Sequence, residues 1–246
     1  RLRKSYNGAC SKVKYESFQK DLKSKHPGSI DFRVAETPVF VPDDFSEKMI
    51  SACEHIVDLI STPGFERQSE KAIPSADHVP GNELPCAFFA FDFGVCMNEE
   101  QELEPQLIEM QGFPSLYAFQ VYYPEVLRKH FPLPDDFSPY LNGYNRETYL
   151  EALRKVILGN VEPEQVILLE IKPHEQKTRI DFYCTQDYLG IQPVCITDLI
   201  PEGNQLYYLN GQTKKKTLIK RIYNRIIFDD LHARQDTLGP HISLNQ

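Results

Sequence analysis

The clearest pattern in the chain is an alternation of apolar and polar residues in two neighbouring segments. The first runs from Phe89 to Gly94 and the second from Leu107 to Leu116. Polar residues from Asn98 to Glu104 lie between them and predict a connection. The two segments therefore predict a β-hairpin.

Pairing the two strands about the middle of this connection sets the register of the hairpin. Asp92 then lies opposite Glu109, and the amide of Gln111 is two residues further along the same face. The other face is apolar, and its expected pairs are Phe91 with Met110 and Phe93 with Ile108. One face of the hairpin is therefore predicted to carry two opposed carboxylates.

Like charges directly opposite each other destabilise a sheet, so another group must offset the repulsion between Asp92 and Glu109. A hard divalent cation would bind both carboxylates and an amide oxygen, while a basic side chain or a shared proton would also reduce the repulsion. Spacing alone does not choose among these. Two solvated surface acids on an ordinary hairpin are a further interpretation.

Apolar periodicity and chain-breaking residues predict the other elements of this half. The firmest helix begins near Asp44 or Ser46, buries one apolar stripe and stops at Pro63-Gly64. Its stripe consists of Met49, Ile50, Cys53, Ile56, Val57 and Ile60. The other predicted elements are a helix over 15–25, a strand over 38–41, a loop over 66–83, a helix over 115–130 and a helix capped by Asn145 that runs to 158.

The pattern changes to strand, helix, strand after residue 165. The apolar run Val166–Ile171 predicts a strand covered on both faces, a helix follows over Thr178–Leu189, and Ile191–Ile196 predicts a second strand. A short hairpin over 203–211 leads to a third strand, Leu218–Ile227, which contains Arg225. Ligands of such doubly wound units bind beyond the carboxyl ends of the strands.

These elements predict an α/β fold with a mixed sheet, a Rossmann-like unit and a carboxylate-bearing hairpin. The Pro- and Gly-rich stretch Phe131–Tyr144 is the best candidate for a boundary. It divides the chain into an N-terminal α+β region over 1–144, with the hairpin, and the Rossmann-like unit over 145–246. A single compact domain is the alternative.

Composition limits the classes of function. The chain of 246 residues is 41% hydrophobic and 25% charged, as in ordinary globular proteins, and its net charge of −8 argues against a nucleic-acid partner. No apolar run approaches the length of a membrane span and no signal pattern opens the chain, so we expect a cytoplasmic protein without a membrane partner. Six scattered cysteines argue against a disulfide framework or a zinc site. Because the chain starts at Arg1, we expect it to be a fragment of a longer protein.

The order of the motifs resembles the first half of the circularly permuted ATP-grasp family, to which glutathionylspermidine synthase belongs. The resemblance covers about residues 86–231. The motifs that carry it are Phe91-Asp92-Phe93, Glu109-Met110-Gln111 with Pro114-Ser115-Leu116, Leu189-Gly190-Ile191, Asp198-Leu199 and Ile222-Tyr223-Asn224-Arg225. The fold that it implies for the second half is the pre-ATP-grasp unit.

The resemblance implies an enzyme that uses ATP and Mg²⁺ to join a small-molecule carboxylate to an amine through an acyl phosphate. It implies a magnesium-binding set of Asp92, Glu109 and Gln111, substrate-binding residues Ser115 and Tyr223, and a catalytic guanidinium in Arg225. The nucleotide-binding half of the family lies downstream of the block that ends in Arg225. We therefore expect that half of the same protein to be a required partner, without which this chain does not hydrolyse ATP.

Three departures from the family pattern argue against catalysis, and two of them, Ala90 and Asn224, favour a second hypothesis, a non-catalytic binding module that has kept the fold. Ala90 stands where the family has Arg, Gln111 where it has Asn, and Asn224 where it has a basic residue. A metal-dependent hydrolase built on Asp92 and Glu109 is a third hypothesis.

Two of the candidate site residues also have purely structural interpretations. Ser115 is the N-cap of its predicted helix. Arg225 is half of an ion pair with Asp229 or Glu170.

Overall fold

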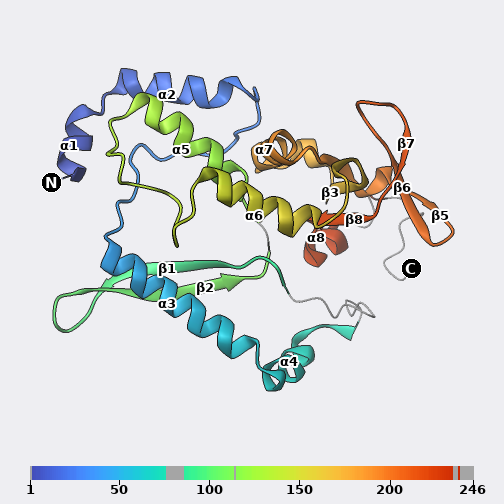
Figure 1. Cartoon of the computed structure of the whole chain (residues 1–246), viewed down its shortest axis with the longest axis horizontal. Helices are drawn as coiled ribbons and strands as arrows, with labels where there is room; N and C mark the ends of the chain where they lie inside the picture. Colours follow the sequence, from blue (N-terminus) through green and yellow to red (C-terminus); the bar gives the residue numbers. More distant parts are fainter. Residues whose placement is uncertain (1, 76–85, 114, 235–237, 239–246) are drawn as a thin grey trace. The chain divides into compact units, whose positions relative to one another are not determined.

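The computed structural model describes residues 2–75, 86–113, 115–234 and 238, with Glu66 described by its backbone only. The chain forms two compact units, one of residues 1–37 and 115–246 and one of residues 38–114. The predicted mixed α/β class is confirmed, since both units contain helices and strands (Figure 1). The proposed boundary at residue 144 falls within the first unit, where Arg128 donates to the carbonyls of Pro134 and Phe137 in the Pro-rich stretch.

The unit of residues 38–114 is a helical segment packed on two antiparallel strands. Helix α3 (Asp43–Ile60) lies against strand β2 (Leu103–Gln111), which pairs with β1 (Ala90–Met97), as Figure 1 shows. The predicted apolar stripe of α3 is half-buried along its length. The loop expected over 66–83 is wrong at its start, because α4 (Pro63–Ser69) and η1 (Glu70–Ala72) are helical, while residues 76–83 lie outside the described part.

The strand expected over 38–41 is also wrong, because this segment forms no strand and pairs with no described strand.

The pairing of β1 with β2 contains a bulge beside the two carboxylates. Asp92 lies opposite Glu109, but the register shifts between Asp92 and Phe93, so that Phe93 lies opposite Leu107. The expected pair of Phe93 with Ile108 is therefore wrong. The extra residue in the longer strand leaves the Ile108 side chain 70% exposed.

The unit of residues 1–37 and 115–246 contains most of the helices. They are α1 (Leu2–Ala9), α2 (Lys12–Ser24), α5 (Phe119–His130), α6 (Arg146–Leu158), α7 (Arg179–Leu189) and α8 (Phe228–Ala233). Helix α2 packs along α5 (Figure 1), and the buried ring of Phe18 meets the rings of Tyr123 and Phe131 there. Asn145 and Thr148 form the capping box that begins α6.

Three parallel strands form the central sheet of this unit, in the order β4-β3-β8. Every residue of β3 (Val166–Glu170) is buried, and α7 connects β3 to β4 (Gln192–Cys195). Gly190 ends α7 with a φ of 79°, in the left-handed region that glycine adopts without strain.

Strands β5 (Ile200–Glu202), β6 (Gln205–Leu209) and β7 (Lys216–Leu218) form a separate antiparallel sheet. The single strand expected over 218–227 is therefore wrong. β7 belongs to this sheet and β8 (Arg221–Asn224) to the parallel one. The chain changes sheet where Ile219 N donates to Leu206 O and Lys220 N donates to Gln165 O.

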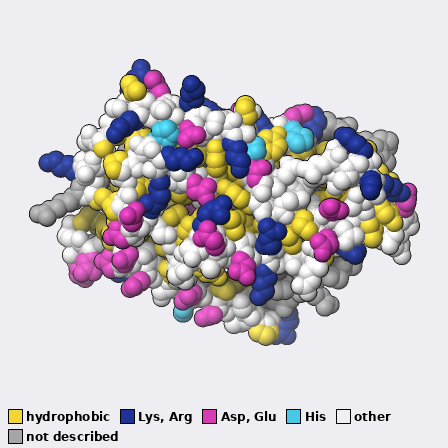
Figure 2. Space-filling view, turned by 45° about the horizontal axis from the view of Figure 1, so that its top comes forward, with side chains coloured by type: hydrophobic (Ala, Val, Ile, Leu, Met, Phe, Trp, Pro, Cys, Tyr) yellow, Lys and Arg dark blue, Asp and Glu magenta, His cyan; other side chains and the backbone are white. Residues whose placement is uncertain are grey.

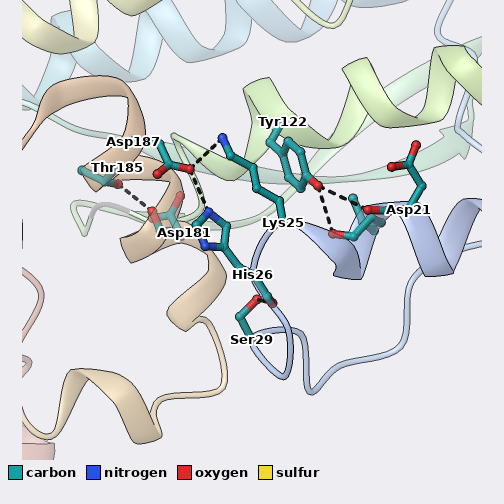
Figure 3. Close-up of polar contacts among 9 residues, drawn as sticks. Asp21, Lys25, His26, Ser29, Tyr122, Asp181, Thr185 and Asp187 are labelled. Atoms are coloured by element: carbon teal, nitrogen blue, oxygen red, sulfur yellow. Dashed lines mark hydrogen bonds and ion pairs between the residues drawn. The ribbon is translucent and has the colours of Figure 1, made fainter.

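Ion pairs fasten the C-terminal end of α2 to α7, as Figure 3 shows. Lys25 Nζ and His26 Nε2 each lie 2.7 Å from Asp187 Oδ2. On the neighbouring helix the Tyr122 hydroxyl donates to Leu22 O at 3.2 Å. The bond from Tyr122 joins residues 100 positions apart in the sequence, and the contact of His26 with Asp187 joins residues 161 positions apart.

The surface carries charges of both signs. On the face shown in Figure 2, Lys and Arg side chains are interspersed with Asp and Glu side chains. Among the described residues, no helix has the length and apolar character needed to cross a membrane.

Candidate functional site

The first group of candidate residues lies on the β1–β2 pair. Asp92 and Glu109 are both exposed and directly opposed. Gln111 Nε2 donates to Glu109 Oε1 at 2.5 Å. Within the described ranges neither carboxylate forms an ion pair, so no described basic side chain lies close enough to pair with either of the opposed charges.

Asp92 and Glu109 are the two carboxylates that this face would offer to a hard cation. Two carboxylates are available, but the Gln111 amide presents its nitrogen, not its oxygen, to Glu109. The described residues contain no group of three or more His, Cys, Asp or Glu side chains able to hold a metal ion. A pair of carboxylates would supply only part of a ligand set. Mg²⁺ can use such a pair, because it binds through one or two carboxylates and completes its octahedron with water and phosphate oxygens.

The second group is organised by Asp181, a completely buried carboxylate in the first turn of α7. Its Oδ1 accepts hydrogen bonds from Ala118 N at 2.9 Å and Phe119 N at 2.8 Å, which are the first amides of α5. The helix expected from Ser115 therefore starts at Phe119, and Ser115 is not its N-cap. A carboxylate more than sixty residues away caps it instead.

Residues 115–118 form a turn that leads into α5. Leu116 has a φ of 57° in this turn, in the left-handed region that costs a leucine about 1–2 kcal/mol. Its carbonyl accepts a hydrogen bond from Gln120 N at 3.0 Å. Asp181 and Gln120 thus hold the strained turn in place.

Tyr223 and Arg225 come from the carboxyl end of β8, and each is only 5% exposed. Arg225 N donates to Leu169 O at 2.9 Å, which continues the β3–β8 ladder beyond the strand. The Arg225 guanidinium lies over the ring of Phe182, 5.4 Å from its centroid. Both side chains are therefore held in the interior, at the carboxyl end of the parallel strands.

Electrostatic interactions join these residues to the turn. Burial raises the pKa of Asp181, while hydrogen bonds from the turn's amides and the positive charge of Arg225 oppose that rise. Burial also raises the pKa of Tyr223, and the negative charge of Asp181 raises it further. The Tyr223 phenol therefore stays protonated at neutral pH and is a hydrogen-bond donor.

Glu170 is the second buried acid near Arg225. Burial raises its pKa, while a hydrogen bond from Ile171 N and the charge of Arg225 lower it. The Arg225 charge thus acts on both Glu170 and Asp181.

The candidate residues fall into the two units. Asp92, Glu109 and Gln111 belong to the unit of residues 38–114, whereas Ser115, Tyr223 and Arg225 belong to the other. Within the unit of residues 1–37 and 115–246, the structure brings Tyr223, Arg225 and the turn after Ser115 around Asp181. Sequence reasoning missed Asp181, because an acid in the first turn of a helix is an ordinary feature.

Comparison of the chain with protein-family models, curated proteins and solved structures finds no match.

Proposed function

We propose that this chain is the substrate- and metal-side part of an ATP-dependent carboxylate–amine ligase of ATP-grasp type, acting through an acyl phosphate. The observation that carries the proposal is the opposed pair Asp92 and Glu109, two exposed carboxylates without a described ion-pair partner. Together with the family resemblance, this pair favours a cation as the missing counter-charge.

In the proposed enzyme Asp92 and Glu109 hold Mg²⁺ on the exposed face of the hairpin. When bound, Mg²⁺ neutralises the negative charge of nucleotide phosphates. Arg225 supplies a buried, permanently positive guanidinium for the charge of the transferring phosphoryl group. Tyr223, as a protonated phenol, and Ser115 orient the substrate carboxylate by hydrogen bonds.

A non-catalytic binding module is the second candidate, and Asn224 favours it. The Asn224 side chain donates to Ile226 O at 3.0 Å and accepts from Ile226 N at 3.1 Å. It therefore fixes the turn after β8 at the position where the family has a basic residue. The Gln111 amide, which presents its nitrogen to Glu109, also favours the binding module.

Metal binding tests the proposal directly. Mn²⁺ binding is measured by calorimetry and electron paramagnetic resonance on the wild type, on the Asp92→Asn/Glu109→Gln double variant and on a Glu99→Gln/Glu104→Gln control. The control removes the same charge from exposed positions of the same hairpin segment. We expect saturable binding to the wild type and the control, and at least a tenfold loss in the double variant.

Equal binding to all three proteins, or no binding to the wild type, would refute the metal assignment. A double variant that is then more stable than the wild type would identify Asp92 and Glu109 as surface acids that repel each other, as the binding-module hypothesis predicts.

A further inference from the structure

A pocket of about 380 Å³ opens between segments of the unit of residues 1–37 and 115–246. One wall is the irregular segment before α3, the other is the start of α5 with the turn before it. Its lining includes Phe32, Arg33, Val34, Leu116, Phe119 and Tyr123. The volume falls in the range of small-molecule sites.

The aromatic rings of Phe32, Phe119 and Tyr123 line the pocket. The Phe32 and Phe119 rings meet edge to face at 5.9 Å, and the Phe119 and Tyr123 rings lie 5.7 Å apart. Phe32 and Tyr123 are only half-buried, so part of each ring is left for a ligand. Edge-to-face and offset contacts with a further ring are the arrangements that such walls favour.

The irregular wall is fastened by side chains from three helices. The Tyr15 hydroxyl donates to Val34 O at 2.6 Å and the Tyr6 hydroxyl donates to Glu36 O at 3.2 Å. Arg179 Nη1 lies 2.6 Å from Asp31 Oδ2. A segment without helix or strand is thus held rigid on both sides of Arg33, as in a preformed binding loop.

The opposite wall stores backbone strain. Leu116, in the left-handed region, lines the pocket and lies next to Ser115. Strained residues are retained where the surrounding structure fixes them, and they cluster at binding sites. Here Asp181 fixes the turn by bonding the amides of Ala118 and Phe119.

Charge decides what kind of ligand the pocket suits. Arg33 is the one charged residue among the described residues that line it. Its pairing with Glu36 is long, at 3.6 Å, and the Arg33 side chain is 88% exposed, so this ion pair is weak. The guanidinium is therefore available at the rim for an anionic group, for which it is suited by its paired donors.

We propose that this pocket binds a small aromatic carboxylic acid, with the ring among Phe32, Phe119 and Tyr123 and the carboxylate at Arg33. At about 30 Å³ for each water-sized atom, the pocket holds on the order of a dozen non-hydrogen atoms. The inference goes beyond the proposed function and requires neither metal nor nucleotide.

The probes are 3-phenylpropionate, 3-phenylpropionamide and 3-phenylpropylamine, which share one skeleton and differ in charge. Binding to the whole chain is measured by calorimetry and by amide chemical shifts of Ala35, Leu116 and Gln120. We expect the acid to bind about five- to tenfold more tightly than the amide, and the amine to bind most weakly. Arg33→Gln should reduce the affinity for the acid to that for the amide.

Two further variants complete the test. Ala35→Phe places a ring in the pocket from an exposed position and should abolish binding of all three probes. Lys215→Gln removes one positive charge from the turn between β6 and β7 and should leave binding unchanged. Failure of the acid to bind at 10 mM, equal binding of acid and amide, or binding that survives Ala35→Phe would overturn the proposal. None of these outcomes alters the Mn²⁺ binding that tests the ligase proposal.

Discussion

Removal of the Asp181 carboxylate is expected to destabilise the start of α5. Asp181→Ala deletes the oxygen that accepts from Ala118 N and Phe119 N, and both of these residues are buried. Each hydrogen bond to a charged acceptor contributes about 1.5–3 kcal/mol. Deleting both therefore costs about 3–6 kcal/mol.

Part of this loss is offset, since a buried carboxylate also carries a desolvation penalty. Asp181 Oδ2 has no hydrogen-bond partner among the described residues, and the charge of Arg225 offsets the cost of its burial only in part. We expect a net loss of about 3 kcal/mol for Asp181→Ala, in line with breaking a buried charge network. Asp181→Asn keeps an accepting oxygen and should lose only about 1 kcal/mol.

Urea unfolding gives the free energies, and hydrogen exchange of the Ala118 and Phe119 amides gives the local effect. Both amides should exchange much faster in Asp181→Ala than in Asp181→Asn. Asp135→Ala, at an exposed loop position, is the control and should match the wild type. Equal stability of the alanine and asparagine variants, or unchanged exchange of the two amides, would show that Asp181 does not cap α5.

Three further predictions concern the ion pairs of Asp187, the N-cap of α6 and the strained turn at Leu116. Burial alone would raise the pKa of Asp187, but hydrogen bonds and charge from Lys25 and His26 bring that pKa below its usual value. The contribution of Asp187 to the free energy of unfolding is therefore present above about pH 4 and is lost as the pH falls through the folded pKa. Asp187→Asn should therefore cost at most about 1 kcal/mol at pH 7, with no difference from the wild type near pH 2 in urea unfolding. Asn145→Ala removes the capping box of α6 and should cost about 1 kcal/mol, seen as a lower thermal midpoint, whereas Asp136→Ala, at an exposed position of the preceding loop, should leave the midpoint unchanged. Leu116→Gly relieves the strain of the positive φ but increases the conformational entropy of the unfolded chain, so we expect the free energy of unfolding to change by no more than about 1 kcal/mol. The variant also removes a side chain that lines the pocket and should lose 3-phenylpropionate binding. Leu116→Ala should lose binding in the same way but keep the backbone strain.

Local signals in the sequence predicted elements whose ends are set by neighbouring residues. Asn145 and Gly159 bracket α6, and Gly190 ends α7, as their residue types indicate. The apolar run of β3 indicated a strand buried on both faces. Each of these features depends on residues within one turn of the chain.

Features that depend on contacts between residues distant in the sequence could not be predicted from local patterns. The start of α5 depends on Asp181, and the change of sheet after Leu218 depends on Gln165. The bulge beside Asp92 changed the expected partner of Phe93, because the extra residue is Ile108 of the other strand and no glycine or proline stands next to it there. The alternation of apolar and polar residues predicted that Asp92 lies opposite Glu109, whereas no sequence pattern predicted the buried neighbours of Arg225.

The discontinuous first unit has a consequence for the order of events during synthesis. Helix α2 packs on α5, and the bond from the Tyr122 hydroxyl to Leu22 O joins residues 100 positions apart. At about 5–20 residues per second, a ribosome delivers the second partner about 5–20 s after the first. The apolar side of α2, with Phe18 and Leu22, therefore has no native partner on α5 until the whole unit of residues 38–114 has been made. A nascent chain arrested within that unit should expose these residues to chaperones.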